Sequence, residues 1–402
     1  MDSLLETGLP GTPDFDTYAI VADLTAARCD GVLVELDWSD GRRSRFHALW
    51  LRDNCAGPES LNDVTREQTT SPLQLSADVR AEAVWVDAAG ALNLRWAGED
   101  FVSRFHPGWL RHHDFANQDN EDPGAPPLHL WDAEEMPEPA TFDGGDILND
   151  DTVLEAWLSA FARYGIARLT GVAAEDGMIT RVGERLGTLR VSNFGILFDV
   201  KSKIDADSNA FTALELEPHT DLGTREYLPG LQFLHCLRNT AGGGRAVMVD
   251  GYRVAEAIRA ERPDVFRALC EIHWTWTNRH ADSDYRWRAP ILSLHPDGGY
   301  REIRATYFLR GPSPLPDGRL EEAYESMRVL YTYLHDPRYR MVFPYAPGDL
   351  VGFDNRRILH AREAFDPDHG ERWLQGCYLE RDELASRLRI LDRKRRAAAQ
   401  NG

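Results

Sequence analysis

The sequence predicts a mainly β protein with flanking helices, divided into two domains. Two features predict this class: short apolar segments that alternate with polar residues, and a stretch rich in Asp, Asn, Pro and Gly that interrupts them. The chain has 402 residues, which is more than one ordinary domain needs. Its hydrophobic content of 43% is enough to form buried cores. We expect a small N-terminal β domain at 1–115, a linker at 116–147 and a larger domain at 148–402.

Alternating apolar residues predict the strands of the N-terminal domain. Val34, Leu36 and Trp38 have the same parity and precede the turn sequence Ser-Asp-Gly. Because side-chain direction repeats every two residues in a strand, these residues share one face. Val84–Val86 and Leu92–Trp96 flank Ala-Ala-Gly, which is the pattern of a β-hairpin.

The larger domain begins with a helical pattern. From Leu154 onward, apolar residues recur at i, i+3, i+4 and i+7, Asp150 or Asp151 can cap the start, and Gly165 can end the helix. A strand is expected next, at 166–172. The same reading predicts helices at about 252–270 and 319–335, and strands at 231–237, 245–250, 349–354 and 373–380.

Composition excludes several classes of partner. The formal net charge is -20 and the pI is about 5.1, so a nucleic acid backbone would be repelled. The N-terminus lacks the basic and apolar regions of a signal peptide, and no apolar run approaches a membrane span. We expect a cytoplasmic protein that binds neither nucleic acid nor membrane. The five cysteines are scattered, as is typical of reduced thiols.

The most informative motif is His219-Thr-Asp221, which is followed far along the chain by His360 and then by Arg372. Two imidazoles and one carboxylate can occupy one face of an octahedral iron(II), leaving the opposite face for a co-substrate and O2. If His219 and Asp221 lie in an extended chain, the single residue between them keeps both side chains on one side. Arginine suits a dicarboxylate co-substrate because its planar fork pairs bidentately with a carboxylate. The combination indicates an oxygenase.

Further motifs resemble one family. The stretches that carry the resemblance are His219-Thr-Asp-Leu, Pro229-Gly-Leu-Gln-Phe-Leu-His-Cys, Val249-Asp-Gly-Tyr, Phe353-Asp-Asn-Arg-Arg-Ile-Leu-His, Ser386-Arg-Leu-Arg-Ile-Leu and, near the N-terminus, Leu49-Trp-Leu-Arg-Asp-Asn-Cys. Through them, the segment from about 190 to 392 and the N-terminal part resemble the γ-butyrobetaine hydroxylase and trimethyllysine hydroxylase branch of the 2-oxoglutarate-dependent iron(II) dioxygenases.

The resemblance implies a double-stranded β-helix (jelly-roll) catalytic domain behind the small N-terminal β domain, and a homodimer. It implies that His219, Asp221 and His360 bind iron(II), and that Arg372 holds the distal carboxylate of 2-oxoglutarate. Relatives often bind a structural zinc through three cysteines and one later histidine in the N-terminal domain. Here only Cys55 remains, and Asp100 stands at the histidine position. Since a tetrahedral zinc site needs four ligands, we predict no structural zinc.

The resemblance also indicates where a substrate would bind. Family members that act on trimethylammonium compounds enclose the cation in aromatic rings, whose negative faces attract it. The aligned positions here are Phe194, Phe198, Phe211 and Tyr378.

Relatives that bind a carboxylate-bearing betaine hold its carboxylate with asparagines, but Ser208 and about Tyr307 occupy those positions. The segment 274–310 is rich in Trp and Arg, including Arg279, Arg286, Arg288, Arg304 and Arg310. Some of these arginines could bind an anionic group larger than a carboxylate, such as a phosphonate, or they could form a solvated loop paired with nearby acids.

We therefore expect 2-oxoglutarate- and O2-dependent hydroxylation of a small quaternary ammonium zwitterion with a carboxylate or phosphonate, releasing succinate and CO2. Trimethyllysine or a natural-product intermediate is the alternative substrate. Two other classes stay open: a non-catalytic binding protein for cationic metabolites, and a zinc hydrolase that uses the same three ligands. The hydrolase gives no role to Arg372.

Overall fold

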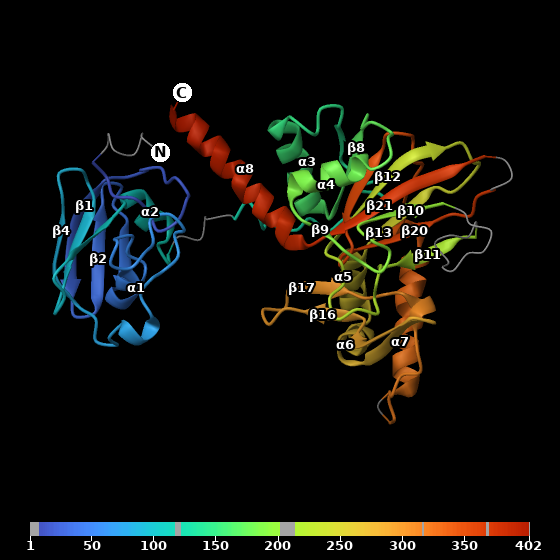
Figure 1. Ribbon diagram of the computed structural model, residues 1–402. Helices are drawn as coiled ribbons and strands as arrows, with labels where there is room; N and C mark the ends of the chain where they lie inside the picture. The colour runs from blue at the N-terminus through green and yellow to red at the C-terminus, as the bar shows by residue number, and fades with distance from the viewer. Residues whose placement is uncertain (1–7, 117–121, 202–213, 316, 367–369, 402) are drawn as a thin grey trace. The chain divides into compact units, whose positions relative to one another are not determined.

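The computed structural model describes residues 8–116, 122–201, 214–315, 317–366 and 370–401 (Figure 1). The chain forms two compact units, Met1–Glu121 with Arg393–Gly402, and Asp122–Asp392. Within the described ranges, every helix is too short or too polar to span a membrane.

The first unit contains two three-stranded antiparallel sheets. One sheet is formed by β1 (Leu24–Asp30), β2 (Leu33–Trp38) and β3 (Arg43–His47), and the other by β4 (Ala81–Val86), β5 (Leu92–Trp96) and β6 (Val102–Phe105). Two short helices, α1 (Ala48–Asp53) and α2 (Pro107–His112), complete it. The predicted alternation is confirmed, since Val34, Leu36 and Trp38 are buried, and β4 pairs with β5 as a hairpin.

The second unit contains a seven-stranded and a four-stranded sheet. The large sheet has the order β10-β21-β12-β19-β8-β7, with β9 beside β21, and the small sheet the order β11-β20-β13-β18. The large-sheet strands are β7 (Thr141–Asp143), β8 (Ile166–Thr170), β9 (Leu189–Arg190), β10 (Leu197–Val200), β12 (Leu231–Asn239), β19 (Leu350–Asp354) and β21 (Arg372–Leu379). The small-sheet strands are β11 (Leu216–His219), β13 (Ala246–Asp250), β18 (Met341–Phe343) and β20 (Ile358–Arg362).

The two sheets pack against each other, and successive strands of the chain belong alternately to one sheet and the other. Apolar side chains of β12, β19 and β21 form one buried cluster with those of β13 and β18; Leu234, Val351, Met248 and Phe343 are examples. Along the chain, β11, β13 and β20 of the small sheet alternate with β12, β19 and β21 of the large one. All the strands expected in this domain from the sequence are present, with ends shifted by a few residues.

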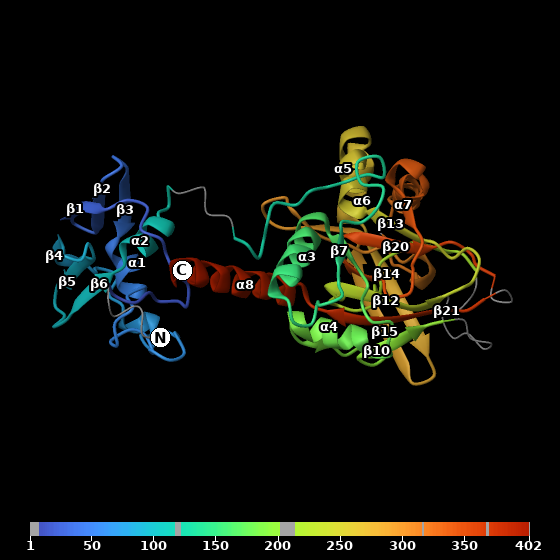
Figure 2. The ribbon, with the colours of Figure 1, turned by 90° about the horizontal axis from the view of Figure 1, so that it is seen from above.

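Two helices cover the large sheet. Helix α3 (Asp151–Tyr164) and α4 (Met178–Leu186) pack through Trp157, Phe161 and Val182 onto Phe233 and other sheet residues (Figures 1 and 2). The predicted ends of α3 are confirmed. Asp150 accepts hydrogen bonds from the first turn, and Gly165 ends the helix with φ 75°, a conformation that favours glycine. The helix α8 (Arg381–Asn401) adds Leu384 and Leu388 to the same core.

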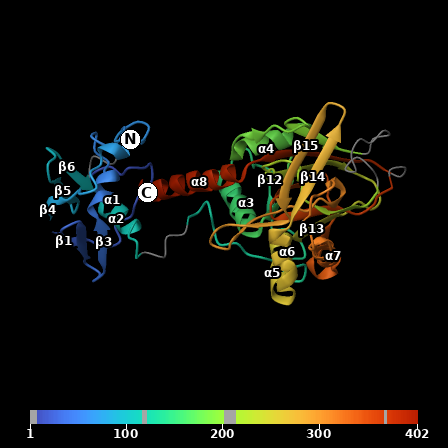
Figure 3. The same ribbon diagram turned by 90° about the horizontal axis from the view of Figure 1, so that it is seen from below.

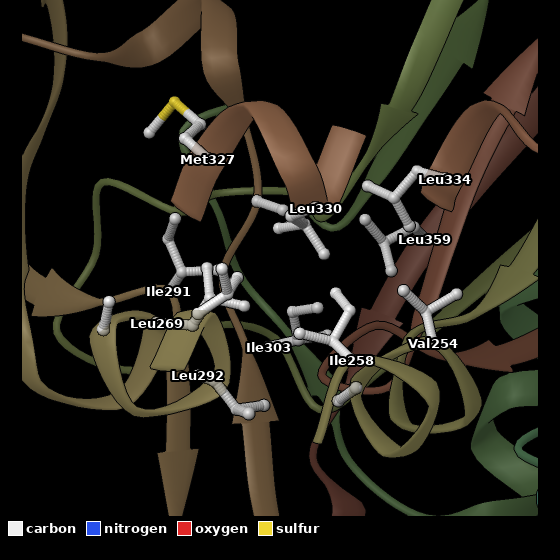
Figure 4. Close-up of a cluster of buried hydrophobic side chains, with 14 of the residues drawn as sticks. Val254, Ile258, Leu269, Ile291, Leu292, Ile303, Met327, Leu330, Leu334 and Leu359 are labelled. Carbon is white, nitrogen blue, oxygen red and sulfur yellow. The ribbon is translucent and has the colours of Figure 1, made fainter. Parts of the chain in front are cut away.

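A second group of helices covers the small sheet. These are α5 (Gly251–Glu261), α6 (Pro263–Glu271) and α7 (Leu320–His335), and the strand pairs β14 (His273–His280) with β15 (Ser283–Pro290) and β16 (Leu292–Leu294) with β17 (Tyr300–Ile303) follow α6. Figure 4 shows side chains of α5, α6 and α7, such as Ile258, Leu269 and Leu330, meeting in one core. The helical segment expected at 252–270 is split, because Pro263 begins a new helix after Arg262.

Candidate metal centre and substrate cavity

His219, Asp221 and His360 meet at one point of the small sheet. His219 ends β11, His360 lies in β20, and these antiparallel strands place the two histidines directly opposite each other. Their ring centroids are 4.2 Å apart. Asp221 Oδ1 lies 3.3 Å from His219 Nε2 and 3.6 Å from His360 Nε2. Among the described residues this is the group of three or more His, Cys, Asp or Glu side chains that could hold a metal ion.

Asp221 reaches this point through a turn. The expectation of an extended chain holds only up to His219, where β11 ends. The backbone N–H of Asp221 donates to Asn355 Oδ1 at 2.7 Å, and Asn355 Nδ2 donates back to the Asp221 carbonyl at 3.1 Å. Leu222 then adopts φ 54°, which is rare for a residue other than glycine. Hydrogen bonds from Asn355, which lies between β19 and β20, therefore fix the turn that carries the carboxylate, and they leave no local pattern in the sequence.

The surroundings suit three metal ligands. His219 Nδ1 lies 2.8 Å from the Glu217 carbonyl oxygen, so a proton on Nδ1 leaves the Nε2 lone pair facing Asp221. Burial, together with the neighbouring His219, lowers the pKa of His360 to about 3, which keeps its imidazole neutral. Burial would raise the pKa of Asp221, but the two imidazoles and the Tyr378 hydroxyl bring that pKa below its ordinary value.

Tyr378 joins the metal centre to the large sheet. Its hydroxyl donates a 2.7 Å hydrogen bond to Asp221 Oδ2, while Asp221 Oδ1 faces the two histidines. Burial and the adjacent carboxylate raise the pKa of Tyr378 well above its ordinary value, so the hydroxyl keeps its proton. Two imidazole nitrogens and one oriented carboxylate oxygen form the donor set of a non-haem iron(II) site. The residues present fit that metal.

Arg372 begins β21, opposite Asn239 of β12, and is 7% exposed. Within the described residues its guanidinium has no carboxylate partner, and its Nε has no hydrogen-bond acceptor. Burial lowers the pKa of Arg372, since the charged form is deprived of water. A buried charge without a partner is costly, so this position fits an anion supplied by a ligand. Nearby, the buried Tyr345 hydroxyl also lacks a hydrogen-bond partner.

One cavity of about 590 Å³ connects these groups. Its lining includes the three candidate ligands and, in addition, Arg372, Tyr345, Phe194, Phe198 and Tyr378. Three of the four predicted cage rings therefore meet: the centroids of Phe194 and Phe198 are 5.9 Å apart, and those of Phe198 and Tyr378 are 5.0 Å apart. The fourth ring, Phe211, and the predicted clamp position Ser208 lie outside the described residues.

Tyr307, the other predicted clamp position, lies elsewhere. It lines a second cavity with Tyr331, whose hydroxyl accepts a 3.2 Å hydrogen bond from the Tyr307 backbone N–H. The neighbouring Phe308 lines the first cavity instead, with its ring centroid 5.4 Å from that of His219. Phe308 and Tyr345 are wall residues that the sequence reasoning missed, whereas Arg279, near the tip of the β14–β15 hairpin, belongs to the segment that it singled out. The Trp/Arg-rich composition of 274–310 was the available signal for the hairpin.

The surroundings of Cys55 are those of a buried thiol. Cys55 is 2% exposed, and its Sγ lies 3.1 Å from Ser60 Oγ and 3.9 Å from Arg52 Nη1. Asp100, which stands where relatives carry a histidine, is exposed. The absence of a structural zinc stays a prediction.

Comparison with known proteins identifies the family. Residues 123–378 match the model described as taurine catabolism dioxygenase TauD, TfdA family, and residues 26–111 match gamma-butyrobetaine hydroxylase-like, N-terminal. The chain is 42% identical over 383 residues to gamma-butyrobetaine dioxygenase of Pseudomonas sp. (strain AK-1), covering 94% of this chain and 99% of that protein.

Two other relatives are more distant. Gamma-butyrobetaine dioxygenase of Homo sapiens is 29% identical over 377 residues, covering 91% of this chain and 96% of that protein. Mitochondrial trimethyllysine dioxygenase of Gallus gallus is 29% identical over 366 residues, covering 89% and 86%. The resemblance seen in the sequence motifs is thereby confirmed. The chain belongs to the TauD/TfdA family, and it is a 2-oxoglutarate-dependent non-haem iron dioxygenase.

Proposed function

We propose that this protein hydroxylates a small quaternary ammonium zwitterion similar to γ-butyrobetaine, with His219, Asp221 and His360 as iron(II) ligands. One observation carries the proposal: the three candidate ligands, the buried Arg372, which has no carboxylate partner among the described residues, and an aromatic wall of Phe194, Phe198 and Tyr378 all line the same cavity. The 42% identity to a gamma-butyrobetaine dioxygenase supports the same substrate class.

The chain's own residues would bind and orient the reactants. When bound, iron(II) together with 2-oxoglutarate and O2 supplies the oxidising chemistry, and succinate and CO2 are released. Tyr378 holds Asp221 Oδ2, so that Oδ1 stays directed at the metal position. Arg372 offers its guanidinium to the distal carboxylate of 2-oxoglutarate, and the Tyr345 hydroxyl is a second donor within the same cavity.

Replacing Arg372 with methionine is expected to raise the KM for 2-oxoglutarate by about 30-fold or more, because truncating one partner of a buried charge pair costs about 2–5 kcal/mol. The dissociation constant for 2-oxoglutarate, measured anaerobically by calorimetry, should rise by the same factor. Arg238→Met is the matched control, since Arg238 lies at the same end of the β12–β21 pair, opposite Trp373, but is 62% exposed and pairs with Glu371. An unchanged dissociation constant in Arg372→Met would remove Arg372 from the co-substrate site.

The aromatic wall would bind the cation. Phe198 lies opposite Gly376 in the β10–β21 pair, and a Cβ on Gly376 would come within 2.4 Å of the Phe198 ring. Gly376 therefore makes room for the ring that faces Tyr378. The faces of such rings attract a quaternary ammonium group without requiring hydrogen bonds.

Gly376→Ala is expected to raise the KM for the ammonium substrate about tenfold, since it displaces Phe198 from the wall and weakens the cation–π contact by about 1–2 kcal/mol. The KM for 2-oxoglutarate should change little. In a Phe198→Leu background the added methyl finds space, and its effect on the substrate KM should shrink. Equal effects of Gly376→Ala in both backgrounds would argue against this role for Phe198.

The alternation of strands between two packed sheets supports a further proposal, that the second unit is a double-stranded β-helix. We also propose the domain division 1–115, 116–147 and 148–402 and a homodimeric assembly. Size-exclusion chromatography with light scattering tests the assembly, and a monomer at micromolar concentration would contradict it.

A substrate panel tests the proposed function. Purified protein with iron(II), ascorbate, 2-oxoglutarate and air is given γ-butyrobetaine, trimethylaminoethylphosphonate or trimethyllysine, and succinate is quantified. The proposal expects strong stimulation by one of the first two compounds. Preference for trimethyllysine would move the assignment to the activity named for the Gallus gallus relative. Lack of stimulation by any trimethylammonium compound would overturn the proposed substrate class.

A further inference from the structure

The β14–β15 hairpin supplies polar groups to the cavity. Its strands pair antiparallel from His273↔Pro290 to His280↔Ser283, and Figure 3 shows it as a two-stranded ribbon separate from the main sheets. Residues near its tip line the cavity: Thr277, Asn278, Arg279, His280 and Ser283. Trp274 and Trp276, nearer the base, are buried and anchor the hairpin in the helical core.

Arg279 differs from the other arginines of this segment. Arg286 pairs bidentately with Asp284, and Arg288 donates to the Pro314 carbonyl. Farther along the segment, Arg304 binds Glu302 and the carbonyls of Gly223, Arg225 and Glu226, and Arg310 donates to the Tyr307 carbonyl. Arg301 is exposed. None of these five is among the described residues that line the cavity.

The ion pair made by Arg279 is weak. Its Nε lies 3.8 Å from Asp284 Oδ1, and both oxygens of that carboxylate already accept from Arg286. The Arg279 side chain is 51% exposed, so its donors can reach a ligand without losing a strong partner.

The charges of the cavity wall favour an anionic occupant. Among the described lining residues, Arg279, Arg362 and Arg372 are cationic, and the one carboxylate is Asp221. Arg362 and Arg372 are buried, at 6% and 7% exposure, whereas Arg279 is the exposed arginine of the set. Arg362 donates to the Leu214 carbonyl, and Arg372 is assigned to the co-substrate, so Arg279 is the arginine we assign to a second anionic ligand.

Asn278 adds an unsatisfied polar group beside Arg279. Its Oδ1 is buried and has no hydrogen-bond partner in the described part of the chain. A side-chain amide can present either its oxygen or its N–H groups at one position, so Asn278 can donate to an anion. Buried polar atoms normally have hydrogen-bond partners, and a ligand in the cavity would supply the partner of the Asn278 side-chain amide.

Arg225 holds the hairpin near the aromatic wall. Its guanidinium lies 3.2 Å from the centroid of the Tyr285 ring on β15, and its Nη2 donates to Asn193 Oδ1 at 2.9 Å. Asn193 directly precedes Phe194, and both residues line the cavity. The hairpin and the aromatic rings are therefore walls of one enclosure, linked by a defined set of contacts.

We propose that Arg279, assisted by Asn278, binds the anionic end of the zwitterionic substrate, a carboxylate or phosphonate, while its quaternary ammonium group lies against the aromatic wall. This rests on the proposed function and deepens it. The positions where relatives hold a carboxylate with asparagines carry Ser208 and about Tyr307 here. Tyr307 lines the other cavity, so the hairpin takes over this recognition.

The test compares Arg279→Met with Arg288→Met, a matched control on the same hairpin that lies outside the cavity lining. Three probes are used: γ-butyrobetaine, trimethylaminoethylphosphonate, and a trimethylammonium alcohol of equal length without an anionic end. Arg279→Met is expected to lower kcat/KM at least tenfold for whichever anionic compound the wild type uses, and to leave the alcohol within twofold. Arg288→Met should leave all three unchanged. The anionic compound that loses more identifies the natural headgroup.

Substrate affinity provides a second measurement. Asn278→Asp places a negative charge beside the proposed anion, so the dissociation constant of the anionic substrate should rise at least tenfold while the KM for 2-oxoglutarate stays unchanged. An equal loss for the alcohol and the anionic compounds in Arg279→Met would indicate a structural role and overturn the inference. Wild-type kinetics in Arg279→Met would also overturn the inference. Failure of the proposed function is distinguishable, because the wild type itself would then form no succinate with any trimethylammonium probe.

Discussion

Replacing Asp221 with alanine is expected to lower succinate formation by more than about 100-fold, without loss of folding. Losing a group that only orients a metal ligand costs about 10–100-fold, so losing the ligand itself should exceed this range. Asp221 is the one carboxylate among the described lining residues, and its Oδ1 lies within 3.6 Å of both candidate histidine ligands. The measurement is succinate produced per enzyme at saturating iron(II), together with bound iron determined by elemental analysis.

Tyr378→Phe serves as the matched control. It retains the aromatic ring in the wall and removes only the 2.7 Å hydrogen bond to Asp221 Oδ2. Activity should fall by about 10–100-fold, which is less than in Asp221→Ala. Asp221→Ala protein with near-wild-type activity and iron content would contradict the assignment of this carboxylate as a ligand.

Arg357→Met is expected to lower the free energy of unfolding by about 3–5 kcal/mol, the cost of leaving one partner of a buried ion pair unpaired. Arg357 is 1% exposed and binds Asp250 through Nε and Nη2, at 3.2 and 2.7 Å. Asp250 also caps α5, so the pair connects β13, β20 and that helix. Arg357 directly precedes β20, the strand that carries His360.

Urea unfolding monitored by circular dichroism measures this effect. Arg338→Met is the comparison, because Arg338 also donates through Nε and Nη2 to one carboxylate, at Asp336 Oδ2, but is 66% exposed. Exposed pairs contribute about 0–1 kcal/mol, so this variant should unfold almost as the wild type does. Similar destabilisation of the two variants would show that burial does not determine the contribution of the Arg357–Asp250 pair.

The strands could be predicted from local patterns, and the grouping of the three candidate ligands from their residue types. Alternation and turn residues predicted β12, β13, β19 and β21, and the residue types of His219, Asp221 and His360 indicated that they could hold one metal ion. These signals are short-range, or rest on residue types that few other roles require.

The details that depend on long-range packing could not be predicted. The turn that directs Asp221 is fixed by Asn355, and the Tyr378 hydroxyl reaches Asp221 from the other sheet. Neither contact leaves a local pattern, because each depends on how β11, β19 and β21 are placed by the whole fold. That Phe308, and not Tyr307, lines the cavity of the candidate metal centre could not be predicted for the same reason. A short helical turn at Tyr307–Leu309 directs the two rings to different cavities. The break at Pro263 was visible in the sequence and is a local signal that the helix prediction overlooked.

Hydroxylation that depends on 2-oxoglutarate and O2 is tested most directly by the stoichiometry of the reaction with the best trimethylammonium substrate. Succinate and hydroxylated product are quantified together, in air and under anaerobic conditions, for the wild type and Asp221→Ala. We expect one succinate per hydroxylated product in air, and neither product without O2 or without Asp221. Substrate conversion that continues without O2, or that proceeds without formation of succinate, would contradict this expectation.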